Sequence, residues 1–416
     1  MKESGISWVG EIPKEWSVKK IKHISYVIGG NGFNVELQGL ESGDYPFCKA
    51  SDISNAGKYL DKAANYVTFD IVRDQHYNII PKGAILFPKI GEAMKKNNRT
   101  ICVLDCCVDN NCQAIVPFER NSGMFLYYIL TCVNMGCFDN AGTIPCMNNR
   151  KFLNSKVPFP SIDEQQRIAE FLDRECGKID GLKADIQAQI DTLEQYKRSV
   201  ITEAVTHGLN PSAPMKDSGI PWVGKTPEYW KVGRIGGLYE LRNQKVSDKD
   251  FMPLSVTMKG ILPQLETAAK TNDGDNRKLV RVGDFAINSR SDRRGSCGIS
   301  DYDGSVSLIN TILKPRNRMN AKYYNWLFHT PMFADEFYKW GHGIVDDLWT
   351  TNWSEMKRIS IPLPPLDEQQ EIADYLDNKC AEIEQIIADK KTQIETLDGY
   401  KKSLIYEYVT GKKEVG

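Results

Sequence analysis

The chain has 416 residues and a formal net charge of −1, with 41% hydrophobic and 26% charged residues; this is the composition of an ordinary globular protein of two to four domains. The sequence holds no apolar run of membrane-spanning length, and its first residues lack the basic and then apolar pattern of a signal peptide. We therefore expect a cytoplasmic protein without membrane contact.

The opening residues of the chain recur in its middle. MKESGISWVGEIPKEW at residues 1–16 matches MKDSGIPWVGKTPEYW at residues 215–230. A second, longer pair of similar segments begins at Val157 and at Ile361. The chain thus reads as an opening motif, a variable block and a helix, followed by the same three parts again. This order predicts a pseudo-twofold internal repeat.

The two variable blocks, residues 17–157 and 231–360, are barely alike, but pieces of their frame correspond. Pro81-Lys82-Gly83-Ala84-Ile85-Leu86 resembles Arg281-Val282-Gly283-Asp284-Phe285-Ala286. Matched frames with mismatched interiors indicate one scaffold that carries two different readers. Divergence of an old duplication is the alternative, but it leaves unexplained why the helices stayed similar.

Both blocks are predicted to be mixed α/β. Short apolar stretches at residues 83–87 and 279–287 are bounded by Gly, Pro and Asn, which favours strands. Residues 125–133 and 323–330 have a more helical pattern.

Eleven cysteines are present, and eight of them lie between Cys48 and Cys146. The cluster of Cys102, Cys106, Cys107 and Cys112 could be interpreted as a zinc site. However, no CxxC pair occurs, so the usual spacing of zinc ligands is missing. We expect buried thiols that act as small hydrophobic residues, with zinc as the alternative.

Residues 163–205 contain no proline and predict a long helix of roughly 64 Å, and the chain after residue 366 predicts its copy. Apolar residues at heptad spacing form the predicted seam: Leu172, Ile179, Ile186, Leu193, Val200, Leu376, Ile383, Leu397 and Leu404. A second line of seam positions is expected at Ile168, Leu182, Tyr196, Ile372, Ile386 and Tyr400, with Ile190 beside the seam. Lys390 is a polar interruption of the first line, between Ile383 and Leu397. One helix cannot bury its own stripe, so we expect the two copies to form an antiparallel coiled coil. Packing of each helix on its own domain is the alternative.

Charge is distributed unevenly between these parts. The blocks 17–157 and 231–360 carry +4 and +5, whereas the helical segments 158–216 and 361–416 carry −3 and −5. Phosphate contact should therefore fall on the blocks, and the helices remain available for protein partners.

Two charged stretches follow the corresponding strand-like pieces of the blocks. The predicted DNA-binding residues are Lys89, Lys95, Lys96, Asn97, Asn98 and Arg99 in the first block, and Ser289, Arg290, Arg293 and Arg294 in the second. Arginine can bind guanine bidentately, asparagine can bind adenine, and both also contact phosphate. A solvated loop is the alternative for any single residue, but the equivalent placement in both blocks favours binding.

Motifs for catalysis are missing. The sequence has no phosphate-binding G-x-x-x-x-G-K-[ST] loop, no Asn/Asp-Pro-Pro-Tyr/Phe motif for a flipped base, and no HExxH pair of histidines. We expect no catalytic, cofactor-binding or metal-binding residue in this chain.

The doubled segments resemble the specificity subunits of type I restriction-modification systems. The likeness is carried by Pro158-Phe159-Pro160 with Glu164-Gln165-Gln166, by Pro362-Leu363-Pro364-Pro365 with Glu368-Gln369-Gln370, and by the motifs that end in Trp16 and Trp230. The resemblance implies an α/β fold of two target-recognition domains joined by two long helices, and a non-catalytic, DNA-binding subunit. Its domains would be target-recognition domain 1 at 1–157, a helical spacer at 158–214, target-recognition domain 2 at 215–360 and a second helical spacer at 361–416.

The same resemblance implies the partners. Each domain would read half of a bipartite asymmetric site in double-stranded DNA, and the helices would set the gap and dock two modification subunits. Those subunits would methylate adenine with S-adenosylmethionine, and restriction subunits with ATP and Mg²⁺ would join them. A coiled-coil adaptor without a DNA role and a stand-alone methyltransferase or nuclease are the alternatives.

Overall fold

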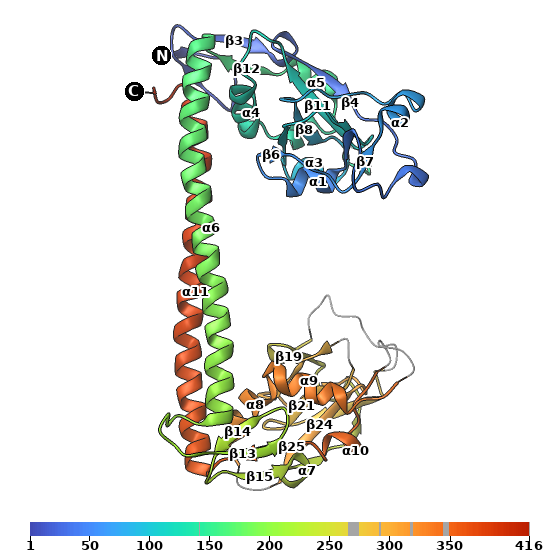
Figure 1. The fold of residues 1–416 in the computed structure, drawn as a ribbon, viewed down its shortest axis with the longest axis vertical. Coiled ribbons are helices and arrows are strands. Elements are labelled where there is room, and N and C mark those ends of the chain that lie inside the picture. Colours follow the sequence, from blue (N-terminus) through green and yellow to red (C-terminus); the bar gives the residue numbers. More distant parts are fainter. Residues whose placement is uncertain (141, 265–273, 291–292, 317–318, 344–348, 416) are drawn as a thin grey trace. The chain divides into compact units, whose positions relative to one another are not determined.

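The computed structural model describes residues 1–140, 142–264, 274–290, 293–316, 319–343 and 349–415. It divides into two compact units, one of Met1–Asp185 with Thr392–Gly416 and the other of Ile186–Lys391. Each unit contains one mixed α/β domain and a part of both long helices, α6 (Ile162–His207) and α11 (Leu366–Val409), as Figure 1 shows. Within the described residues, no helix combines the length and the apolar character needed to cross a membrane.

The domain of the first unit is built on a five-stranded sheet. Its order is β4 (Ser25–Gly29), β11 (Cys112–Pro117), β8 (Ile85–Pro88), β9 (Thr100–Cys102) and β6 (Tyr59–Leu60). The first four strands pair antiparallel, and β6 runs parallel to β9. Strand β11 is buried from Cys112 to Val116 because hydrophobic cores cover both faces of the sheet at this strand. A smaller sheet combines β10 (Cys107–Val108), β5 (Tyr45–Cys48) and β7 (Tyr66–Val67).

Short helices connect and cover these strands. They are α1 (Ala50–Asn55), α2 (Phe69–Asp74), α3 (Glu92–Lys95), α4 (Gly123–Cys132) and α5 (Asn149–Asn154), with 3₁₀ turns at Ile21–His23, Val35–Leu37 and Met135–Phe138. Helix α4 is apolar nearly all round, so it is buried between the sheet and α6. Its Phe125 and Ile129 share one core with Ile115 of β11 and Leu172 of α6. This core attaches the domain to the long helix.

The domain of the second unit repeats the central part of this arrangement. Its main sheet has the order β16 (Tyr239–Leu241), β24 (Asn310–Pro315), β21 (Phe285–Asn288) and β22 (Cys297–Ile299), all antiparallel. Around it lie β17 (Lys245–Val246), β20 (Arg277–Val280) and β23 (Gly304–Val306), the hairpin β18 (Leu254–Thr257) and β19 (Gly260–Pro263), and the helices α7 (Ile235–Leu238), α8 (Ala321–Phe328), α9 (Pro331–Lys339) and α10 (Trp353–Met356). The predicted strands and helices of both blocks are confirmed, although the stretch 279–287 forms parts of two strands, β20 and β21.

The repeated segments form the same elements in both units. Each opening motif is a hairpin, β1 (Lys2–Glu3) with β2 (Glu11–Ile12) and β13 (Met215–Ile220) with β14 (Gly224–Pro227). Each block is closed at its base by an antiparallel pair, β3 (Ser17–Lys20) with β12 (Lys156–Phe159) and β15 (Lys231–Arg234) with β25 (Ser360–Leu363). The block therefore begins and ends on neighbouring strands, so its interior can vary without moving the helix that follows.

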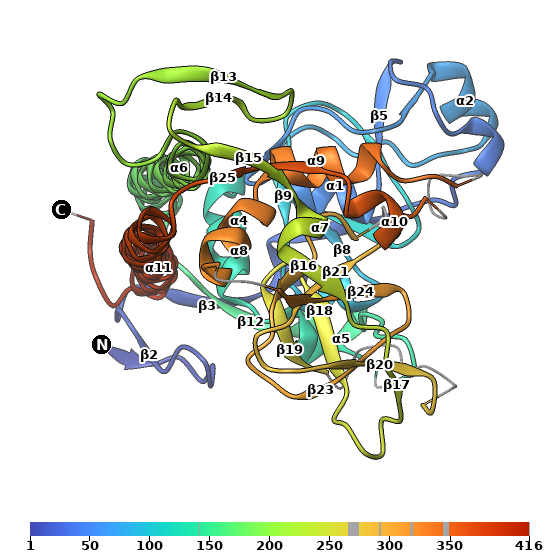
Figure 2. The same ribbon diagram turned by 90° about the horizontal axis from the view of Figure 1, so that it is seen from below.

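The two long helices pack against each other, antiparallel, in both units. In the first unit, Lys183 Nζ lies 2.5 Å from Asp398 Oδ1, and Lys401 Nζ lies 2.7 Å from Asp180 Oδ2. In the second unit, Lys197 pairs with Glu384. Residue numbers fall along one helix as they rise along the other, which defines the direction; Figure 2 views the pair end-on. The predicted fold class, with two mixed α/β domains and an antiparallel helix pair, is confirmed.

All nine predicted seam residues are buried or half-buried. The predicted second line was partly wrong: Ile168 and Ile372 are buried, but Leu182, Tyr196, Ile386 and Tyr400 are 45–57% exposed. Burial instead alternates by four and three residues, which places Cys176, Lys183, Ile190 and Lys197 of α6 in that line. A lysine fits there because its methylene stem covers the seam while its ammonium group reaches a carboxylate of the other helix. The apolar side chains of Leu182, Tyr196, Ile386 and Tyr400 therefore remain exposed on the surface of the helix pair.

Both chain ends belong to the first unit, where they lie close together. Tyr406 Oη donates a hydrogen bond to Trp8 O at 3.1 Å, and Lys412 Nζ donates to Glu11 O at 2.6 Å. The internal copy has the same layout, since Gly208 at the end of α6 lies against Trp230 just as Gly411 after α11 lies against Trp16. The pseudo-twofold repeat thus predicts neighbouring termini, and the structure confirms this (Figure 1).

Candidate nucleic-acid interface

The two predicted DNA-binding loops leave equivalent strands. β8 and β21 each begin after a glycine turn, with φ of 85° at Gly83 and 84° at Gly283, a conformation that glycine adopts at low cost. The Gly83 N–H donates to Cys102 O at 2.7 Å, and the Gly283 N–H donates to Ser300 O at 2.8 Å. β8 lies between β11 and β9, and β21 lies between the equivalent strands β24 and β22. The loops that follow β8 and β21 therefore start at equivalent places in the two domains.

In the first domain, the lysines of the loop reach the surface. Lys95 and Lys96 are exposed, whereas Lys89 and Asn98 are half-buried. Lys95 Nζ forms an ion pair with Glu92 Oε1 at 3.0 Å, one helical turn earlier. An exposed pair of this kind contributes little to stability, so Lys95 can exchange this partner for phosphate.

Asn97 and Arg99 differ from the lysines, because their side chains stabilise the loop from inside. Asn97 has φ of 61°, and its Oδ1 accepts hydrogen bonds from the Met135 N–H at 3.2 Å and from Arg99 Nη2 at 2.5 Å. Arg99 is only 6% exposed, and burial lowers the pKa of its guanidinium from 12.5 to about 10. In this structure Arg99 is too buried to reach a base edge, and both residues support the loop.

In the second domain, the loop begins with a buried serine, and three arginines follow it in the sequence. Ser289 is buried, and its Oγ lies 2.8 Å from Thr311 Oγ1. Arg290 is half-buried, and its N–H donates to Asn288 Oδ1 at 3.0 Å. Arg293 and Arg294 are exposed, while residues 291–292 of the same stretch lie outside the described residues. Ser289 is therefore a support, and the three arginines are the side chains that can reach a ligand.

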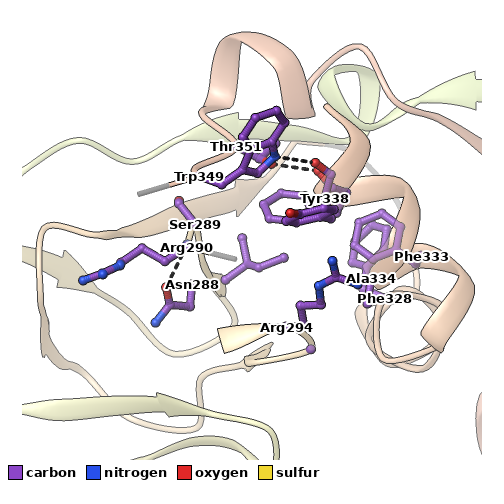
Figure 3. A pocket seen from close by; sticks show the side chains of 13 residues that line it. Asn288, Ser289, Arg290, Arg294, Phe328, Phe333, Ala334, Tyr338, Trp349 and Thr351 are labelled. Atoms are coloured by element: carbon purple, nitrogen blue, oxygen red, sulfur yellow. Dashed lines mark hydrogen bonds between the residues drawn. The ribbon is translucent and has the colours of Figure 1, made fainter. Parts of the chain in front are cut away.

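A small pocket lies beside this second loop, as Figure 3 shows. The aromatic rings of Phe328, Phe333, Phe337, Tyr338 and Trp349 contribute to its walls, and Asn288, Ser289, Arg290, Arg294 and Thr351 also line it. The guanidinium of Arg294 lies 3.8 Å from the centre of the Tyr338 ring, and its Nη1 lies 3.1 Å from Asp335 Oδ1. A cation stacked on an aromatic ring and held by a carboxylate has a defined orientation at the surface.

A buried glutamine at the start of each long helix attaches the recognition domain. Gln165 Oε1 accepts from the Ser122 N–H at 3.2 Å, and Gln165 Nε2 donates to Pro160 O at 3.0 Å. In the second unit, Gln369 Oε1 accepts from the Asn320 N–H at 2.9 Å, and its Nε2 donates to Pro364 O at 2.9 Å. Ser122 and Asn320 cap the equivalent helices α4 and α8. The second residue of each Glu-Gln-Gln motif thus connects the domain to the long helix through hydrogen bonds.

An aspartate two turns further along each helix makes a second attachment. Asp173 Oδ1 accepts from Tyr128 Oη at 3.2 Å and pairs with Lys58, whose ammonium also lies 4.8 Å from the centre of the Tyr128 ring. Asp377 Oδ1 accepts from Trp326 Nε1 at 3.0 Å. Burial lowers the pKa of Lys58 from 10.5 to about 8, although the Asp180 carboxylate favours the charged form.

These glutamines and aspartates were missed as functional residues from the sequence, although a usable signal was present. Each pair is identical and separated by 204 positions, Gln165 with Gln369 and Asp173 with Asp377. A polar residue that recurs in both copies on the domain-facing side of a helix indicates an attachment, whereas solvent-exposed positions tolerate change.

The opening motifs contact the helix ends differently in the two units. Trp230 Nε1 donates to Glu368 Oε2 at 2.8 Å, and Tyr229 Oη donates to Glu368 Oε1 at 3.0 Å. Trp16 is 2% exposed, and its Nε1 has no hydrogen-bond partner among the described residues. Packing alone therefore holds the first motif at this point.

The cysteine cluster of the first domain is part of its core. Cys102, Cys106, Cys107 and Cys112 are all buried. Burial raises the pKa of the Cys107 thiol to about 12, so it stays protonated at neutral pH. Among the described residues, no group of three or more His, Cys, Asp or Glu side chains could hold a metal ion, which gives the zinc interpretation no support.

Comparison with known proteins places this architecture in a family. Residues 13–192 and 227–396 match the family "Type I restriction modification DNA specificity domain". The putative type I restriction enzyme MjaX specificity subunit of Methanocaldococcus jannaschii is 24% identical over 439 aligned positions, covering 98% of this chain and 96% of that protein. The MjaIX specificity subunit of the same organism is 26% identical over 248 positions, and the match spans 56% of this chain and 54% of that protein.

Solved structures agree in fold. A structure described as "Structural basis underlying complex assembly and conformational transition of the type I R-M system" matches with a TM-score of 0.70 at 14% identity, covering 97% of this chain and all of that one. The HsdS subunit from Thermoanaerobacter tengcongensis matches with a TM-score of 0.50 at 16% identity, covering 97% and 98%. Specificity subunits are non-catalytic and carry no cofactor, since S-adenosylmethionine, ATP and Mg²⁺ belong to the modification and restriction subunits. With two matched segments that span most of its length, this chain belongs to the type I restriction-modification specificity subunit family.

Proposed function

We propose that each recognition domain reads one half of a bipartite, asymmetric site in double-stranded DNA, and that the helix pair sets the gap and docks two modification subunits. The observation that carries this proposal is the pair of loops after β8 and β21. They start at equivalent places in two unlike domains, and both present exposed cations, Lys95 and Lys96 in one and Arg293 and Arg294 in the other.

The charge distribution supports the same division of labour. The two blocks carry +4 and +5, and the helical segments carry −3 and −5. Contacts from cations to phosphate position a protein on DNA, whereas contacts to base edges specify the sequence. Because the loops differ in sequence, the two domains would read different bases, and the target would be asymmetric.

Exposed apolar side chains on the helices support the docking of two partners. Leu182 is equivalent to Ile386 in the repeat, and Tyr196 is equivalent to Tyr400. All four are about half exposed. In the first unit, the ion pairs at Lys183 and Lys401 bracket the level of Leu182 and Tyr400. Two equivalent sets of exposed apolar groups suit two copies of one partner better than a single partner.

Restriction subunits would complete the assembly, and the complex would act on DNA in the cytoplasm.

A change of helix length should alter the target in a predictable way. One residue inserted into each helix rotates the chain beyond the insertion by about 100°, whereas a whole turn of four residues nearly restores the rotation. We therefore expect single insertions to weaken DNA binding and four-residue insertions to preserve binding with a different gap.

The decisive experiment exchanges one block. Residues 231–360 are replaced by the corresponding block of a relative, and methylated sites are mapped across the genome of cells that express the complex. One half of the methylated site should change while the other half stays. A change in both halves, or in neither, contradicts independent reading. Absence of DNA binding by the assembled complex would favour the adaptor alternative.

Docking is tested separately on the helix surface. Ile386→Asp should remove one modification subunit from the complex, and the double variant Leu182→Asp with Ile386→Asp should remove both, because each charge is placed in an apolar contact. Gln393→Asp, at an exposed polar position of α11, is the matched control. Native mass spectrometry counts the subunits. Unchanged stoichiometry in the double variant would contradict docking at these residues.

A further inference from the structure

The pocket beside the second loop has the size of a single small group. Its cavity volume is about 20 Å³, while a site for one water molecule needs roughly 10–15 Å³. The pocket is therefore of a size that a substituent of a base can fill.

The chemistry of the walls favours an apolar substituent. Trp349 Nε1 donates to Tyr338 O at 2.9 Å, and Thr351 Oγ1 donates to Phe337 O at 2.7 Å. These hydrogen bonds, drawn in Figure 3, direct the polar atoms of the two side chains to the protein backbone. Phe328 and Phe333 contribute only carbon atoms and are buried. A polar guest would lose its hydrogen bonds to water with little compensation, whereas burial of a methyl group away from water is favourable.

Two arginines also line the pocket. Arg290 is half-buried, and Arg294 lies across Tyr338 with its guanidinium exposed. Asn288 and Ser289 precede these arginines on the same loop. An apolar recess beside two guanidinium groups matches the edge of a base pair in the major groove, where the thymine methyl group lies near phosphates and guanine acceptors.

We propose that this pocket receives the 5-methyl group of a thymine in the half-site read by the second domain. This rests on the proposed function, because it names one base within that half-site. The Arg290 and Arg294 guanidinium groups contact the neighbouring phosphate or guanine, and the aromatic walls read the methyl group. Ala334 is the wall residue through which the pocket can be closed, since a larger side chain at its half-buried Cβ would fill the space.

The test compares thymine with uracil, which lacks only the methyl group. The chain is assembled with its modification subunits. The DNA half-site that residues 231–360 read is the one that changes in the block-exchange experiment. Thymines of that half-site are replaced one at a time by deoxyuridine in synthetic duplexes. At one position the dissociation constant should rise about fourfold, the value of one buried methyl group.

Ala334→Leu links this effect to the pocket. The variant should lose the preference for thymine over uracil at that position and keep any preference in the other half-site. Ala321→Leu on α8, which is also half-buried but does not line the pocket, should keep both preferences. Parallel duplexes with adenine or N6-methyladenine identify the source of the methyl group.

Several results would overturn the proposal. They are a half-site without thymine, equal binding of thymine and uracil at every position, and an Ala334→Leu variant that retains the preference. A preference that Ala334→Leu removes for N6-methyladenine but not for thymine would assign the pocket to a different base. Failure of the assembled complex to bind its site would instead refute the proposed function, so the two failures are distinguishable.

Discussion

Gln165→Ala should destabilise the attachment of the first recognition domain to α6. Gln165 is 1% exposed, and it forms one hydrogen bond to the Ser122 N–H and one to Pro160 O. Alanine leaves both backbone groups buried without a partner, and each such group costs about 1–3 kcal/mol. We expect the free energy of unfolding to fall by about 2–4 kcal/mol, since water can enter part of the vacated space.

The neighbouring residue supplies the control. Gln166 is exposed, so Gln166→Ala should change the free energy of unfolding by less than about 0.5 kcal/mol. Urea denaturation followed by circular dichroism measures both variants. Hydrogen exchange adds a local readout, because the Ser122 amide should lose its protection in Gln165→Ala and keep it in Gln166→Ala.

Two results would refute this reasoning. Equal destabilisation by Gln165→Ala and Gln166→Ala would mean that helix propensity, and not the buried hydrogen bonds, determines the loss. Unchanged protection of the Ser122 amide in Gln165→Ala would mean that this hydrogen bond does not hold α4.

Three further outcomes are expected from the structure. Asp377→Ala should cost about 1–2 kcal/mol of unfolding free energy, because Trp326 Nε1 loses its acceptor, and Asp374→Ala at an exposed position should cost less; urea denaturation decides. The folded pKa of Lys58, about 8, lies below its ordinary 10.5, so the unfolding free energy should rise as the pH increases from about 8 to 10.5. Lys58→Met should remove this rise, and parallel profiles of variant and parent would contradict it. A circular permutant with joined termini and new ends within residues 208–214 should fold with near-parental secondary structure by circular dichroism, and an unfolded product would contradict the equivalence of the two junctions.

Periodicity and repetition made the architecture predictable from the sequence. The heptad stripe identified both helices, and the repeated segments identified their partnership, because both signals are local or recur at a fixed offset. Four positions of the predicted second seam line were wrong because they were selected by hydrophobicity alone. Leu182 and Tyr196 are apolar but exposed, whereas Lys183 and Lys197 occupy the seam by reaching carboxylates of α11. Such pairs cannot be seen until the register of the two helices is known.

The charged loops after β8 and β21 were predictable in position, but the burial of each of their residues was not. A run of Lys, Asn and Arg indicates a charged loop, yet the buried Arg99 and the exposed Lys95 look equally suitable in the sequence. The aromatic pocket gave no signal because Phe328, Tyr338 and Trp349 are separated along the chain and meet only in the folded domain. Tertiary packing, which a single sequence does not display, decides both cases.

The attachments explain how one frame can carry two unlike readers. Gln165 and Gln369 hold their domains through backbone N–H groups, which every residue except proline offers, so the side chains at Ser122 and Asn320 are required only to cap their helices. The aspartates accept from whatever donor the block presents, a tyrosine hydroxyl at Asp173 and an indole N–H at Asp377. The demands on the block are therefore a helix at the right place, an apolar face for the core that it shares with the long helix, and a donor on its helix-facing side. A block that meets these demands can change its other loops without disturbing the helices, which is the property that the proposed exchangeable reader requires.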